Sequence, residues 1–194
     1  MLRIILVRPG TTDYDHQGRI QGTLDIPLND QGTLEAKNLA EQLRGEGIQV
    51  VYASESAPSL QSGQLIAAGL AVKLKRLDQM ENLDHGLWQG MLIDEIRRKH
   101  PKVYRQWQEQ PESVCPPDGE MLSQAEERVR ASILKLMKRH RGGVIALVLP
   151  EPLASLVRAF VKHNGVGDLW KAAGERAWWE VLEITAEQFL APSN

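Results

Sequence analysis

The sequence predicts an α/β fold of three layers, in which helices cover both faces of a mostly parallel sheet. Segments with strand character alternate with segments of helical periodicity along the 194-residue chain. This alternation is typical of parallel strands joined by crossover helices. Residues 4–7 and 144–149 are also continuously apolar, as central parallel strands are because helices cover both of their faces.

The first part of the chain divides into three strands and two helices. Strands are expected at 3–7, 48–54 and 71–77, with helices at 29–47 and 58–70. Asn29 or Asp30 can cap the first of these helices, and Pro58 stands near the first position of the second, where proline is tolerated. In the first helix leucine and alanine recur at helical spacing, at Leu34, Ala36, Leu39, Ala40 and Leu43.

The second part of the chain begins with residues 78–120, which we interpret as a helical insertion packed over the sheet edge and broken by Pro101 and Pro111. A long amphipathic helix follows at 122–140. A strand at 143–149, a helix at 151–165 and a strand at 176–185, placed at the sheet edge, complete the chain. We therefore predict a single domain spanning residues 1–194.

Composition excludes several classes of protein. The net charge is −2, so no basic excess indicates binding to nucleic acid or to a membrane surface. The single cysteine, Cys115, rules out an internal disulfide framework and suits a reducing compartment. No metal-ligand spacing and no cofactor motif is apparent. We expect a cytoplasmic protein without a cofactor or metal.

Two loops stand where ligands bind in such folds. One opens as Arg8-Pro9-Gly10 after the first strand, and the other is Pro150-Glu151-Pro152 after the late apolar strand. Because both strands read as central and parallel, the two loops should lie side by side at the carboxyl edge of the sheet. Both loops carry proline, which offers no nucleophile, acid or base.

The stretch "LVRPGTTDYDHQGRIQGTLDIPLNDQG", residues 6–32, resembles the opening of the histidine phosphatase superfamily, which has the phosphoglycerate mutase-like fold. "GLWQG" at 86–90 and "PPDGE" at 116–120 follow in the order of that family. The matching positions of the opening stretch are Arg8, Gly10, Thr12, Gly18, Arg19, Gln21, Gly22, Asp25, Pro27, Leu28 and Gly32.

The resemblance implies a reaction whose four reacting groups are not intact in this chain. Pro9 stands at the histidine that attacks phosphorus, and Pro58 at an arginine that grips the phosphate. Asn82 stands at the glutamate that donates a proton, and Pro150 at the second histidine. Proline cannot form a phospho-enzyme, and asparagine cannot donate a proton to a leaving alkoxide.

A vestigial phosphate pocket is expected around Arg8, Gly10, Asp15 and Glu151. With Arg8 as its sole certain cation and two carboxylates at its border, such a pocket should repel phosphate. The resemblance and these replacements together predict a catalytically inactive pseudo-phosphatase. It would act by binding a protein or a small ligand in the remodelled cleft.

Several alternatives remain open. The chain is alternatively a phosphomonoesterase or mutase-type enzyme with residual or altered activity, for which His16 and His85 are the two histidines able to border the pocket. A homodimer formed through Trp178 or Trp179 is a further alternative, and these neighbours should face opposite sides of the sheet. Arg8 is either an anion site or, as we favour, a structural residue that bonds loop carbonyls.

Overall fold

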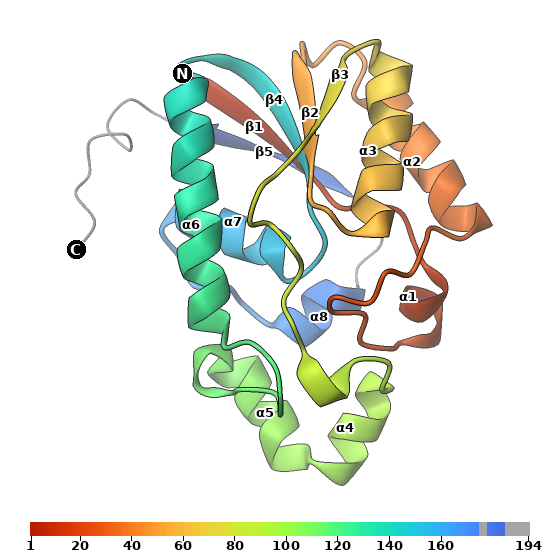
Figure 1. Cartoon of the computed structure of the whole chain (residues 1–194), viewed down its shortest axis with the longest axis vertical. Helices are drawn as coiled ribbons and strands as arrows, with labels where there is room; N and C mark the ends of the chain where they lie inside the picture. The colour runs from red at the N-terminus through yellow and green to blue at the C-terminus, as the bar shows by residue number, and fades with distance from the viewer. Residues whose placement is uncertain (175–177, 185–194) are drawn as a thin grey trace.

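A five-stranded sheet forms the centre of the molecule, with the strand order β3-β2-β4-β1-β5 (Figure 1). The computed structural model describes residues 1–174 and 178–184. The strands are β1 (Leu2–Val7), β2 (Val50–Ala53), β3 (Lys73–Arg76), β4 (Gly143–Val148) and β5 (Trp179–Ile184). All neighbours pair in parallel except β5, which runs antiparallel to β1 at the edge. The predicted class and the position of the last strand are confirmed.

The two continuously apolar strands are neighbours at the centre of the sheet. β1 and β4 pair in register from Leu2 opposite Gly143 to Val7 opposite Val148, so they end at the same level. The backbone N–H of Leu149 donates to the carbonyl of Val7 at 3.0 Å. The loops that follow the two strands therefore start side by side, as the sequence predicted.

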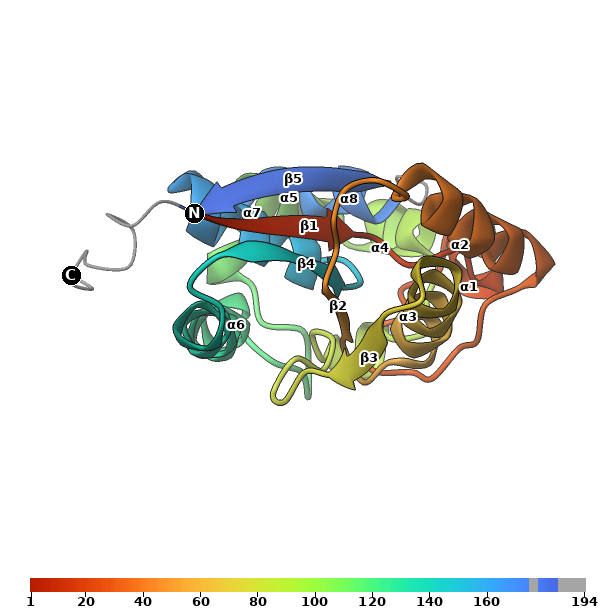
Figure 2. The same cartoon turned by 90° about the horizontal axis from the view of Figure 1, so that it is seen from above.

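Helices cover both faces of the sheet, and the strands fan out from β5 to β3 with the usual twist (Figure 2). Alternate strand residues divide into two apolar clusters, one for each face. The helices α2 (Asp30–Gln42) and α3 (Ala57–Leu70) cover one face. The helices α6 (Leu122–Arg139) and α7 (Leu153–Lys162) cover the other, so the three predicted layers are present.

The helix patterns in the sequence are mostly confirmed. The apolar stripe of α6 is buried along its whole length, from Ala125 to Met137. Asn29 caps α2 by accepting the N–H of Gly32 at 2.9 Å. Leu34, on the predicted apolar pattern of α2, is instead 59% exposed. The apolar spacing therefore predicted helix α2 correctly, but it wrongly placed Leu34 on the buried face of that helix.

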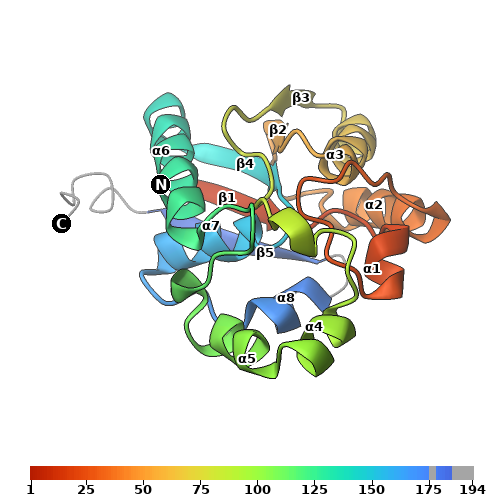
Figure 3. The same ribbon diagram turned by 60° about the horizontal axis from the view of Figure 1, so that its bottom comes forward.

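The remaining helical segments lie beyond the carboxyl ends of the strands (Figures 1 and 3). They are α1 (Asp13–Gln17), η1 (Gly86–Trp88), α4 (Ile93–Lys99), α5 (Pro101–Glu109), η2 (Pro111–Ser113) and α8 (Leu169–Gly174). The predicted insertion thus lies at the ends of the strands rather than along the outer strand. It breaks at Pro101 and Pro111, as expected.

The two tryptophans of the last strand pack within the chain. Trp178 contacts the apolar cluster of one face, and Trp179 contacts the cluster of the other face. The Arg158 guanidinium lies 4.7 Å from the ring centre of Trp178, while the Trp179 Nε1–H donates to Gln42 at 3.1 Å. Their opposite orientation is confirmed, and the homodimer stays a prediction.

A search of the described ranges, residues 1–174 and 178–184, finds no helix with the length and apolar character needed to span a membrane.

Candidate active site

A cleft at the carboxyl edge of the sheet gathers the four replaced positions and the four residues of the expected phosphate pocket. Both strand-end loops, the start of α3 and the segment before η1 contribute to it. The predicted residues that line it are Arg8, Pro9, Gly10, Asp15, Pro58, Asn82, Pro150 and Glu151. The structure therefore brings together residues that lie up to 143 positions apart in the sequence, from Arg8 to Glu151.

The loop after β1 is shaped by a capped helical turn and a close glycine contact. The backbone N–H and the hydroxyl of Thr12 both donate to the Asp15 carboxylate at 2.8 Å, which fixes that carboxylate at the cleft. A Cβ added to Gly10 would lie 2.2 Å from the carbonyl oxygen of Gly32. Only glycine at position 10 lets the loop pass this close to α2.

Arg8 is held by the helix α8. Its guanidinium donates to the carbonyl oxygens of Ala172 and Ala173, the latter at 2.7 Å, and the residue is 7% exposed. Two carbonyl partners match the structural role that we favoured for this arginine. The bonds leave its positive charge in place, and the residue still lines the cleft.

Glu151 presents a carboxylate with one bonded and one unbonded oxygen. It follows β4 and precedes α7, and its Oε2 accepts the backbone N–H of Ser155 at 3.2 Å. Its Oε1 is buried and has no hydrogen-bond partner among the described residues. Glu151 therefore keeps one carboxylate oxygen with a free lone pair in the lining of the cleft.

Of the two candidate histidines, only His85 borders the cleft. His16 is exposed on α1 and is not among the lining residues. His85 is 7% exposed, and its ring centre lies 5.6 Å from that of Trp107. Burial lowers the pKa of His85 from 6.5 to about 4, against the opposing influence of Asp84 and Glu120. At neutral pH its imidazole is uncharged.

Asn82 is fixed by its own side chain. Its Nδ2 donates to the carbonyl of Gly22 at 3.0 Å, and its Oδ1 accepts the N–H of Leu83 at 2.9 Å. Glu81, the neighbouring carboxylate, is exposed. The amide at position 82 therefore ties the segment before η1 to the loop after β1.

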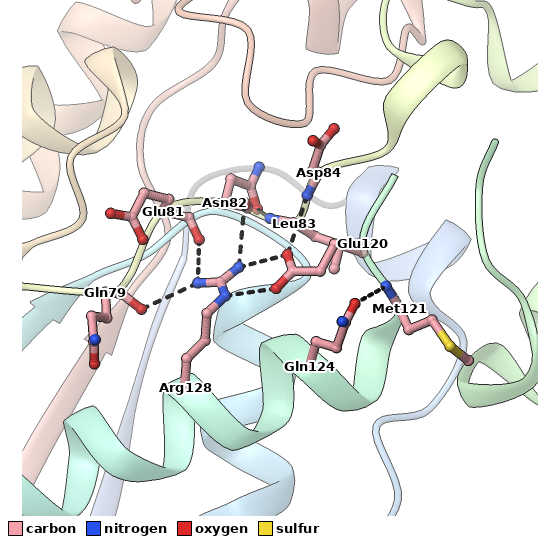
Figure 4. Close-up of polar contacts among 9 residues, drawn as sticks. All are labelled: Gln79, Glu81, Asn82, Leu83, Asp84, Glu120, Met121, Gln124 and Arg128. Carbon is pink, nitrogen blue, oxygen red and sulfur yellow. Dashed lines mark hydrogen bonds and ion pairs between the residues drawn. The ribbon is translucent and has the colours of Figure 1, made fainter. Parts of the chain in front are cut away.

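Arg128 of α6 holds the same segment from the other side (Figure 4). Its guanidinium donates to the carboxylate of Glu120 at 2.8 and 2.9 Å. It also donates to the backbone carbonyls of Gln79, Glu81 and Asn82 at 3.2, 2.7 and 3.4 Å. One cation thus positions the chain on which Asn82 and His85 stand.

Replacing Arg128 by Met should lower the free energy of unfolding by about 2 kcal/mol, since hydrogen bonds to a charged group are lost and Glu120 is left without its cation. Chemical denaturation followed by circular dichroism measures the change. Arg130→Met, on the same helix and without an ion pair among the described residues, is the matched control. Equal losses in the two variants would contradict this role for Arg128.

The charges around the cleft balance. Its charged lining residues are the arginines Arg8 and Arg19 and the carboxylates Asp15 and Glu151. Arg19 donates through Nη1 to the carbonyl of Gly90 at 2.7 Å and through Nε to Gln17 at 2.7 Å. The expectation of a single cation that is outnumbered by carboxylates is therefore wrong. Arg19 was among the motif matches, but its place in the cleft was missed.

Aromatic residues form a wall that the sequence did not predict. Trp107 of α5 and Trp170 of α8 both line the cleft, and their ring centres are 5.9 Å apart. No spacing in the sequence relates the two residues, because the fold alone brings α5 and α8 together. We call Trp107, Trp170, Ile93 and Leu169 the apolar wall.

Among residues 1–174 and 178–184, no group of three or more His, Cys, Asp or Glu side chains is arranged to hold a metal ion.

Comparison with known proteins identifies similar chains over almost the whole length. A model of the histidine phosphatase superfamily (branch 1) matches residues 4–192. Phosphoserine phosphatase 1 of Hydrogenobacter thermophilus is 33% identical over 185 residues, which cover 95% of this chain and 87% of that protein. Phosphoglycerate mutase-like protein 4 of Arabidopsis thaliana is 31% identical over 149 residues, covering 75% of this chain and 64% of that protein.

Solved structures show the same fold. The mycobacterial glucosyl-3-phosphoglycerate phosphatase in complex with VO3 superposes with a TM-score of 0.85 at 22% identity, covering 96% of this chain and 93% of that chain. The predicted three-layer, phosphoglycerate mutase-like architecture is confirmed.

These names overturn the functional prediction made from the four replaced residues. Two of these proteins are named as phosphatases and the third as a phosphoglycerate mutase-like protein, so the names indicate a family of enzymes. The prediction of a catalytically inactive pseudo-phosphatase that acts only by binding is therefore wrong. The loss of the four expected reacting groups does not by itself exclude a reaction, and Arg19 adds a second cation to the cleft.

Proposed function

We propose, from the premise that this chain belongs to the histidine phosphatase superfamily, that it is a phosphomonoesterase with an altered reaction path. The observation that carries the proposal is the cleft itself, whose lining includes two arginines, Arg8 and Arg19, and Glu151, a carboxylate with one unbonded oxygen. The phosphoserine phosphatase that is 33% identical over 95% of this chain supports the same reaction class.

Hydrolysis is favoured over a mutase reaction because of Pro9. A mutase that works through the enzyme must hold the phosphoryl group between two substrate positions, and proline has no lone pair with which to hold it. Water is then the nucleophile. A single displacement by water gives an alcohol and inorganic phosphate, so the product is that of a phosphatase.

Glu151 is the group suited to activate that water. Its Oε1 takes a proton as the water oxygen forms a bond to phosphorus and the bond from phosphorus to the ester oxygen breaks. The leaving ester oxygen takes a proton from solvent, and Glu151 returns its proton to solvent, so the carboxylate is restored. General acid–base assistance of this kind typically contributes about a hundredfold or more to the rate.

Arg8 and Arg19 are the cations available for the phosphate. Phosphoryl transfer depends on positioning and on compensation of the negative charge around phosphorus. Arg8 is oriented by the carbonyls of α8, and Arg19 by the carbonyl of Gly90. We place the phosphate between these two side chains and Glu151. We also propose that the protein works in the cytoplasm, which the single cysteine supports.

The test is phosphate release by the purified full chain, combined with rapid quenching in the presence of a substrate that carries radiolabelled phosphate. We expect release of inorganic phosphate from phenyl phosphate and no label on the protein. Arg19→Met should reduce the release. Absence of phosphate release from every phosphomonoester tried would refute the proposed function, and a labelled protein would refute the single displacement.

A further inference from the structure

We infer that Asn82 and Arg128 are positioning residues, which hold the guanidinium of Arg19 where it binds the phosphate group. Arg128 lies on α6 and is not among the residues that line the cleft, so it acts on the phosphate through the chain between them. The inference rests on the proposed function, in which Arg19 is one of two cations for the phosphate.

The loop that carries Arg19 is paired with the chain segment that follows η1. Three backbone hydrogen bonds of 2.8 to 3.0 Å join the two segments, from Ile20 to Met91, from Gly90 to Ile20 and from Ile93 to Gly18. The Arg19 side chain bonds the same segment, since its Nη1 donates to the carbonyl of Gly90 at 2.7 Å. The position of Arg19 therefore depends on where residues 82–93 lie.

Asn82 joins the start of that segment to the same loop. Its Nδ2 donates to the carbonyl of Gly22 at 3.0 Å, while its Oδ1 accepts the N–H of Leu83 at 2.9 Å. The residue is buried, so the loss of either bond would leave a polar group without a partner away from water. A carboxylate could not replace this amide, because an ionised carboxylate has no N–H to donate.

Arg128 and Glu120 attach the segment to α6 (Figure 4). The Arg128 guanidinium bonds the backbone carbonyl of Asn82 directly, and that of Glu81 more closely. The backbone N–H of Glu120 donates to the carbonyl of Asp84 at 2.8 Å. The side chains of the ion pair are only 20% and 18% exposed, so salt in the solvent screens the pair little. Because α6 is packed on the sheet, it fixes the position of this segment.

Loss of Arg128 or of the Asn82 amide should let the loop around Arg19 shift. Arg8 should keep its place, since the carbonyls of α8 hold it. Binding and transfer of a phosphoryl group depend on the exact placement of the groups around it. Phosphate should therefore bind more weakly to either variant, and only through the displacement of Arg19.

The experiment is a double-mutant cycle on the full chain, with the affinity for inorganic phosphate measured by isothermal titration calorimetry. We expect Arg128→Met to weaken binding about fivefold when Arg19 is present, and by less than about twofold in Arg19→Met. A residue that only stabilises the fold would give the same change in both proteins. Arg130→Met, on the same helix, is the control and should leave the affinity unchanged.

Asn82→Leu is a second, independent variant. It removes the bond to Gly22 but leaves the Arg128 side chain in place, and it keeps the inference testable if Arg128→Met fails to fold. Its effect on phosphate binding should likewise disappear in Arg19→Met. If Asn82 instead touched the phosphate itself, its effect would persist without Arg19.

The outcomes separate this inference from the proposed function. The inference would be overturned by equal weakening with and without Arg19, by no weakening, or by no phosphate binding to the unchanged protein, even if phosphate esters are hydrolysed. A loss of affinity that depends on Arg19, without hydrolysis of any ester, would support the positioning role and refute the phosphomonoesterase.

Discussion

Replacing Glu151 by Gln should lower kcat for phosphate release by about a hundredfold, because the amide cannot take a proton from the attacking water. Glutamine has nearly the same shape and can still accept the N–H of Ser155 through its side-chain oxygen. KM should therefore change little. A larger loss in kcat than in affinity is the signature of a group that acts in the transition state.

The control for this variant is Glu127→Gln, which removes an exposed carboxylate from α6 outside the cleft. Its kcat should equal that of the unchanged protein. If Glu151→Gln keeps more than half of the activity, Glu151 is not the base, and the water must be activated elsewhere.

Acidification from pH 7 to pH 4 should lower the free energy of unfolding, with about 3 kcal/mol of the loss due to His85. Its pKa falls from 6.5 when unfolded to about 4 in the fold because of burial, and each pKa unit corresponds to about 1.36 kcal/mol. A lowered histidine pKa means that the unfolded chain binds the proton first. The contribution of His85 is therefore fully present above pH 6.5 and is lost as the pH falls toward 4.

Urea unfolding at several pH values measures this loss. In His85→Gln the side chain no longer titrates, so the free energy of unfolding should fall less steeply between pH 6.5 and pH 4 than in the unchanged protein. Other carboxylates titrate in both proteins, and the difference between the two curves isolates His85. Identical curves would show that the pKa of His85 is the same in the folded and unfolded protein, which would contradict the predicted effect of burial.

Most of the fold could be predicted because each strand and helix is indicated by a pattern of residues within its own segment of the sequence. The apolar runs of β1 and β4 identified the central strands, and the stripe on α6 identified a helix that covers the sheet. The capping residue Asn29 located the start of α2. The exposed Leu34 is the exception, because hydrophobic periodicity reports an average face and not each residue.

The site could be predicted only in part. Both strand-end loops were expected to meet, since parallel strands end at the same edge, and they do. Arg19, Trp107 and Trp170 line the cleft because of the way α1, α5 and α8 pack beyond the ends of the strands. The spacing of residues in the sequence does not predict that packing. The unbonded oxygen of Glu151 could not be predicted either, because it depends on the hydrogen bonds and burial of the folded loop.

The stereochemistry at phosphorus tests the central claim, hydrolysis by one displacement, most directly. The substrate is an aryl phosphorothioate made chiral with oxygen isotopes and hydrolysed in isotopically labelled water. A single attack by water predicts inversion of configuration at phosphorus. Retention would require two displacements through a phosphorylated protein residue and would contradict the reaction path proposed for this cleft.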